Sequence, residues 1–135
     1  MKKLSGYVLT ALAASVLCLG CRKASEPNIF TIVQLRVTCH AASADVERLE
    51  VDNALEGSFI RDLNTRQDYE IPVFQKGQAT VKLRKGVYLI AFDGDATFSD
   101  GQRKRVRCSS YNYPDKAVAL LEDTRTLQLE LTILN

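Results

Sequence analysis

The sequence has few of the residues from which catalytic and metal sites are usually built. It contains no tryptophan, one methionine and one histidine, His40. His40 directly follows Cys39, and neighbouring strand residues point to opposite faces, so these two side chains do not form a nucleophile–base pair. A zinc site made of Cys39, His40 and Cys108 lacks a fourth ligand and the usual close spacing. We therefore expect no catalytic activity, no metal site and no cofactor.

An excess of charge of one sign is also missing once the first segment is set aside. The full chain has 18 basic and 16 acidic residues. Residues 1–20 hold two lysines and no acid, which leaves 16 basic and 16 acidic residues in the remainder. Without a basic excess there is little to attract a polyanion. We expect no nucleic-acid partner.

The N-terminal segment has the pattern of an export signal. A Met-Lys-Lys start precedes an apolar run over residues 8–19, too short to be a confident membrane span, and the run ends at Gly20-Cys21. This arrangement resembles a bacterial lipoprotein signal with its lipobox. The resemblance implies cleavage after Gly20 and a diacylglycerol on the Cys21 sulfur. The alternative is an ordinary secretory signal.

The remainder of the chain is long enough for one domain. We expect a signal peptide over residues 1–20, a polar tether over 21–28 that begins at the lipidated cysteine, and a folded domain over 29–135. The tether contains one acid, Glu26, so it only weakly resembles the acid-rich signal of surface-exposed lipoproteins. An outer-membrane position is expected, with the domain facing either the periplasm or the outside.

Alternating apolar and polar residues predict an all-β domain. The central stretch is residues 78–92, where an alternating strand is followed by a turn at Arg84-Lys85-Gly86 and an apolar strand that we expect to be covered on both faces. We expect these two strands to form a hairpin. No segment after residue 20 sustains a helical period. Further strands are predicted over residues 31–39, 46–52, 58–63, 68–74, 103–110, 117–121 and 126–134, which favours a single antiparallel β-sandwich of about seven to nine strands.

The central stretch also carries a family resemblance. Leu83, Gly86, Tyr88 and Ile90 match the L-x-x-G-x-Y-x-hydrophobic motif of prealbumin-like (transthyretin-like) and related Ig-like domains. The glycine makes the turn, and the tyrosine starts the buried strand with a hydroxyl that can reach a nearby backbone group. Behind a lipoprotein signal, such a domain is similar to the fimbrillin-type accessory lipoproteins of Gram-negative anaerobes. The resemblance implies a structural or adhesion role.

Residues 93–101 contain acids and glycines and are predicted to form a turn-rich loop. Asp93, Asp95 and Asp100 suggest calcium, but Thr97 and Phe98 break the EF-hand pattern. We interpret this stretch as a solvated turn.

The predicted strand after this loop places Arg103, Arg105 and Arg107 on one face, and Tyr111 and Tyr113 follow. The arginines are suited to an acidic partner, and the tyrosines to a protein contact or a sugar ring. A solvated strand face with ordinary exposed aromatics is the alternative. We expect the protein to contact another protein of the cell envelope through this region, with a small ligand or glycan as the second hypothesis.

Two cysteines remain if Cys18 is removed and Cys21 is acylated. Cys39 and Cys108 lie in the inward phase of their predicted strands, in an oxidising compartment. They form either a disulfide or two buried thiols that pack as small hydrophobes. The sequence leaves both alternatives open.

The lipid anchor is testable through Cys21→Ser. Acyl chains on one cysteine hold a protein to the membrane far more firmly than a polypeptide tether. The variant should therefore accumulate as an uncut precursor or as a soluble product, detected by detergent partitioning and by the mass of the processed chain. Unchanged processing and membrane association would contradict the lipoprotein interpretation.

Overall fold

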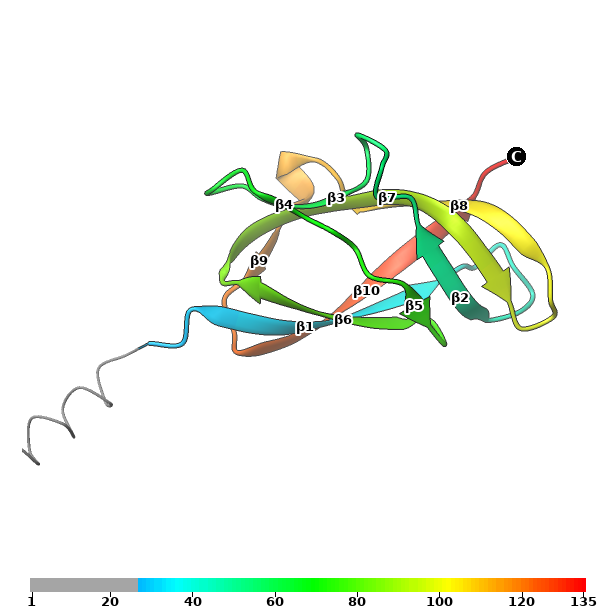
Figure 1. Ribbon diagram of the computed structural model, residues 1–135, viewed down its shortest axis with the longest axis horizontal. Coiled ribbons are helices and arrows are strands. Elements are labelled where there is room, and N and C mark those ends of the chain that lie inside the picture. Colours follow the sequence, from blue (N-terminus) through cyan, green and yellow to red (C-terminus); the bar gives the residue numbers. More distant parts are fainter. Residues whose placement is uncertain (1–26) are drawn as a thin grey trace, which may run out of the picture.

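The computed structural model describes residues 27–135 (Figure 1). The predicted signal over 1–20, Cys21 and most of the tether over 21–28 lie outside the described residues. No helix in the described part is long and apolar enough to cross a membrane. The described residues form ten strands and one 3-10 turn: β1 Phe30–Thr38, β2 Val46–Val51, β3 Phe59–Asp62, β4 Asp68–Tyr69, β5 Phe74–Gln75, β6 Gln78–Arg84, β7 Gly86–Phe98, β8 Arg103–Tyr111, η1 Pro114–Lys116, β9 Val118–Leu120 and β10 Thr124–Ile133.

The all-β prediction is confirmed, but the two-sheet antiparallel sandwich is not what the structure shows. Hydrogen bonding runs through β2, β5, β6, β1, β10, β8 and β7, and a further β2–β7 pairing closes these seven strands into a barrel. Within it, β1 and β10 run parallel, with Leu35 opposite Leu127. Both closing pairings join segments far apart in the sequence, and strand periodicity alone does not specify them.

Strand β7 is paired along almost its whole length on both edges. One edge pairs with β2 and β3, and the other pairs with β8 and then β9. Double pairing satisfies the backbone hydrogen-bonding groups on both edges of the strand. Leu89 lies in the outward phase and is nevertheless buried, as the prediction of a strand covered on both faces requires.

The predicted hairpin at Arg84-Lys85-Gly86 is wrong. Strand β6 pairs with β1 and β5, whereas β7 has other partners, so the chain turns a corner between two parts of the barrel. Gly86 does not take a positive φ. A Cβ there would lie 3.4 Å from Asn64 Nδ2 and 3.6 Å from Asp62 Oδ1, which is ordinary contact with the side chains of the β3–β4 turn.

The predicted loop over residues 93–101 is also wrong in its first part, because β7 continues to Phe98. Asp93 and Asp95 remain in the strand and point outward, where cations of β8 meet them. Gly94 lies against β2 so closely that a Cβ would be 2.5 Å from the carbonyl oxygen of Glu50. The turn is confined to the residues after Phe98.

The predicted strand over residues 68–74 is split into β4 and β5. The side chain of Asn53 accepts a hydrogen bond from the Ile71 N–H and donates one to the Ile71 carbonyl, each at 2.9 Å. These contacts occupy the backbone groups that a continuous ladder would use, and Pro72 supplies no donor. Strand β4 lies at an edge, because it ends the β7–β3–β4 branch.

The barrel interior is filled with aliphatic and aromatic side chains. Phe74 and Phe92 pack with their ring centroids 5.9 Å apart. The Tyr88 hydroxyl donates to the Arg84 carbonyl at 2.6 Å, which confirms the expected contact with a nearby backbone group. Burial, and the nearby Asp62 carboxylate, raise the pKa of Tyr88 well above its ordinary value. The fully buried core includes Val33, Leu35, Leu49, Ile60, Ile90, Val106, Leu120 and Leu129.

The barrel's closure can be tested by substituting Gly94. A methyl group at Gly94 meets the β2 backbone, so Gly94→Ala should destabilise the fold by about 1–3 kcal/mol. Gly57→Ala is the matched control, because no heavy atom lies within 4 Å of a Cβ there. Both are measured by chemical denaturation. Equal stability of the two variants would show that β2 does not approach β7 this closely.

Candidate functional site

The three arginines of β8 lie on the outer face of the barrel, opposite acids of β7. Arg107 is directly across from Asp93, and Arg105 from Asp95. Arg107 makes a two-pronged contact with Asp93, with Nε–Oδ1 at 2.8 Å and Nη2–Oδ2 at 3.0 Å. Cross-strand partners at this spacing are well placed for pairing.

The row continues along the strand. Arg105 donates to Asp52 at 3.1 Å and lies 3.5 Å from Asp95, while Arg103 lies 3.6 Å from Asp95. These six side chains are called the charge ladder below: Asp52, Asp93, Asp95, Arg103, Arg105 and Arg107. The arginines are thus paired within the protein itself, because β7 supplies acids that the predicted loop did not place there.

Ion pairing shifts the titration of the ladder. The hydrogen bonds from Arg107 hold the pKa of Asp93 below its ordinary value, and Asp93 in turn raises the pKa of Arg107. The hydrogen bond with Asp52, assisted by Asp95, raises the pKa of Arg105. These pKa shifts favour the charged forms of Asp93, Arg105 and Arg107. The ladder alternates acids with arginines and so does not present a purely positive surface.

Strand β8 has no open edge along its middle. It pairs with β7 on one side and, through Val106–Cys108, with β10 on the other. The middle of the strand therefore offers no free edge to an added partner strand. A partner that contacts this part of β8 must do so through side chains.

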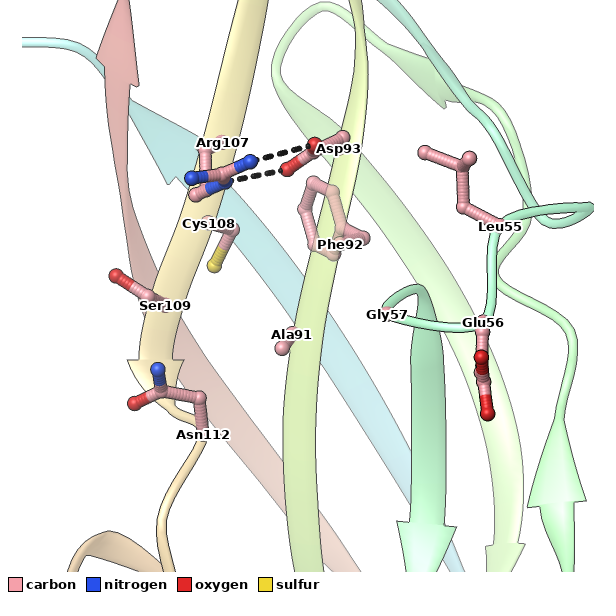
Figure 2. A pocket seen from close by; sticks show the side chains of 10 residues that line it. All are labelled: Leu55, Glu56, Gly57, Ala91, Phe92, Asp93, Arg107, Cys108, Ser109 and Asn112. Atoms are coloured by element: carbon pink, nitrogen blue, oxygen red, sulfur yellow. Dashed lines mark hydrogen bonds and ion pairs between the residues drawn. The ribbon is translucent and has the colours of Figure 1, made fainter.

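A cavity of about 480 Å³ opens beside the ladder. It forms where the β7–β8 register shifts between Ile90 and Phe92, which separates the two strands locally. The loop that joins β2 to β3 borders its other side. The cavity is lined by Leu55, Glu56, Gly57, Ala91, Phe92, Asp93, Arg107, Cys108, Ser109 and Asn112 (Figure 2).

Polar groups stand at the two ends of this cavity. Figure 2 shows the Asp93–Arg107 pair at one end and Asn112 at the other, with Ala91 and Phe92 between them. The Asn112 Oδ1 atom is buried and has no hydrogen-bond partner among the described residues. An unpaired buried acceptor is costly, so it is a natural acceptor for a donor supplied from outside.

The two candidate tyrosines have different surroundings. Tyr111 is half-buried and packs against the core, while Tyr113 is 58% exposed and follows directly after Asn112. On the loop across the cavity, Leu55 is 40% exposed. Of the two tyrosines, only Tyr113 is therefore available as a surface anchor.

Sequence analysis missed Asn112 and the loop residues Leu55, Glu56 and Gly57. This loop is brought to the cavity because β2 and β3 pair with successive parts of the same β7 edge. No local pattern marks that juxtaposition. The only cue was the turn chemistry around Asn112, which indicated a loop but no site.

Both described cysteines are free thiols. Cys108 is buried, and burial raises the pKa of its thiol, while Cys39 is half-buried at the barrel end. Of the two alternatives, the structure therefore shows two free thiols and no disulfide between Cys39 and Cys108. His40 pairs with Glu130 at 3.1 Å, and both side chains are largely exposed.

The candidate metal sets are not assembled. Within residues 27–135, no three His, Cys, Asp or Glu side chains gather where they could hold a metal ion. Asp93 and Asp95 are engaged by arginines, and Asp100 accepts from the Gln102 N–H in the turn after β7.

Comparisons with known proteins give one structural similarity. No protein-family model and no curated protein matches the chain. The chain is similar to the crystal structure of a DUF4876 family protein from Bacteroides thetaiotaomicron VPI-5482, with a TM-score of 0.49 and 14% identity. The match covers 78% of this chain and 24% of that one. This chain therefore spans about a quarter of that protein's length.

The pairing of Asp93 with Arg107 predicts that the folded protein loses stability as the pH falls. Asp93→Asn should remove the part of this pH dependence that Asp93 causes. Because the folded pKa of Asp93 lies below the ordinary 3.8, its contribution is complete above pH 3.8 and is lost as the pH falls through the lowered value. The variant should be less stable than the wild type at neutral pH, and the difference should shrink below about pH 4.

Asp100→Asn is the control, because Asp100 forms no ion pair with the described residues. Denaturant unfolding across a pH series measures all three proteins. A wild-type minus Asp93→Asn difference that stays constant with pH would contradict the pairing with Arg107.

Proposed function

We propose that the protein is a non-catalytic lipoprotein of the Gram-negative outer membrane, anchored through Cys21, that works as an accessory or adhesion subunit by contacting another envelope protein. The contact surface consists of the charge ladder, the cavity, and the exposed side chains of Leu55 and Tyr113. The Gly20-Cys21 pattern supports the anchor. The motif of Leu83, Gly86 and Tyr88 supports a relation to fimbrillin-type accessory lipoproteins.

The observation that carries the contact proposal is the composition of this one surface. Exposed Leu55 lines a cavity beside arginines that aspartates hold in place, and exposed Tyr113 follows directly after Asn112, another residue of the lining. Tyrosine and arginine are enriched where proteins bind each other, and an anchor in a pocket typically supplies much of the affinity. Arginines already held by acids lose little conformational freedom when a partner binds.

Substitution of the two exposed residues, Leu55 and Tyr113, tests this proposal. The double variant Leu55→Ser/Tyr113→Ser should reduce recovery of co-purifying envelope proteins on the order of tenfold or more, as expected for lost interface anchors. Val73→Ser is the control, because Val73 has a similar exposure of 43% and does not line the cavity. Recovery of the same partners at wild-type yield by the double variant would exclude this surface.

A saccharide ligand is the second candidate, and the unpartnered Asn112 Oδ1 favours it. A sugar hydroxyl could donate to this oxygen while the Asp93–Arg107 pair binds other hydroxyls across the cavity. Asn112→Leu removes the acceptor, whereas Asn112→Asp keeps one. If the protein binds a defined oligosaccharide and only Asn112→Leu loses it, the glycan function replaces the protein-contact function.

A further inference from the structure

The described chain begins at a fixed point on the barrel wall. The Asn28 side chain donates to Asp123 Oδ1 at 3.1 Å and accepts from the Phe30 N–H at 3.1 Å. The Ile32 N–H donates to the Asp123 carbonyl at 2.9 Å. The first strand is therefore held to the turn between β9 and β10, and the preceding tether leaves the barrel from this place.

The wall around this point carries exposed apolar side chains. Phe30 and Ile32 share the outward phase of β1, and each is 42% exposed. Leu121, in the adjoining turn, is 62% exposed. An outward pair of large apolar residues beside a third is unusual for a strand face that only meets water, and it is the mark of a contact surface.

Cations surround these apolar residues. Lys82 lies directly across from Ile32, and its Nζ is 4.7 Å from the Phe30 ring centroid. Arg84 lies across from Phe30. Neither cation forms an ion pair with the described residues.

Two further cations nearby are compensated. Lys85 pairs with Asp123 at 2.7 Å, and Arg125 with Glu122 at 3.4 Å. The wall therefore keeps the two uncompensated positive charges of Lys82 and Arg84 beside its apolar side chains. That combination suits an interface of acyl chains and anionic headgroups.

We propose that this wall, made of Phe30, Ile32, Leu121, Lys82 and Arg84, lies against the surface of the bilayer that holds the lipid anchor. The inference rests on the proposed acylation of Cys21. Five residues separate Cys21 from Pro27, and the six Cα–Cα steps between them have a reach of at most ~22 Å. The barrel end where the tether leaves is thus always close to the membrane. The exposed apolar side chains of the wall lie there, and the wall's charges without an ion-pair partner among the described residues are positive.

Contact through this wall orients the molecule. In Figure 1, β1 and β6 form the lower side of the barrel, while β3, β7 and the start of β8 form the upper side. In the strand order, β10 separates β1 from β8. The bilayer contact therefore turns the cavity and the charge ladder away from the membrane, where a partner can reach them.

The absence of tryptophan gives a direct test, because one introduced tryptophan reports alone. The full acylated protein is extracted and reconstituted on vesicles of phosphatidylethanolamine and phosphatidylglycerol. Ile32→Trp is the probe of the wall, and Tyr113→Trp is the control, because Tyr113 is 58% exposed and lies outside the wall, between β8 and η1. Flotation with the vesicles is measured for both variants, together with tryptophan emission and its quenching by lipids brominated on the acyl chains.

Both variants should float, and only Ile32→Trp should shift its emission to shorter wavelength and be quenched by the brominated lipid. Adding Lys82→Glu to Ile32→Trp should reduce that quenching. A floated Ile32→Trp protein with unshifted, unquenched emission overturns the wall contact and leaves the anchor standing. Failure of both variants to float contradicts the anchor itself. A shift without vesicles that grows with protein concentration assigns the wall to a second copy and overturns the bilayer contact.

Discussion

Strand β7 sets the constraint on which the rest of the structure depends, because it must find partners along two edges for thirteen residues. β2 and β3 follow each other along one edge, and β8 and β9 along the other. The pairing of β2 with β7 closes the sheet into a barrel, and this barrel includes the parallel pair of β1 and β10. The missing side chain of Gly94 lets β2 come close enough for this closure.

The same constraint creates the two surfaces on which the proposals rest. The cavity lies where the β7–β8 register shifts between Ile90 and Phe92. The loop between β2 and β3, which carries Leu55, borders it there. The acids in the outward phase of β7 hold the arginines of β8 beside it. On the other side of the ring, β1 and β6 place Phe30 and Lys82 next to the tether. Our proposals assign the first side of the barrel to a partner and the second to the bilayer.

Much of the local structure could be predicted from the sequence. Alternation identified β1 and β10 with Val33, Leu35 and Leu129 inward, because side-chain direction has a period of two residues and the core selects one phase. The closure into a barrel could not be predicted, since it depends on non-local pairings. The continuation of β7 through Asp93 was missed for the same reason. Acids and glycine normally favour a turn, and here they stay in a strand because the arginines of β8 pair with the acids and the β2 backbone packs against Gly94. The cavity was missed because its two sides are distant in sequence.

The most direct test of this account is a measurement of which strands are neighbours. In the isotopically labelled protein, nuclear Overhauser contacts between backbone protons report strand pairing. The closed barrel predicts contacts between Leu49 and Ala96 and between Leu35 and Leu127, with no ladder between β6 and β7. A regular ladder of contacts between β6 and β7, together with no contact between Leu49 and Ala96, would contradict the barrel and the placement of both surfaces.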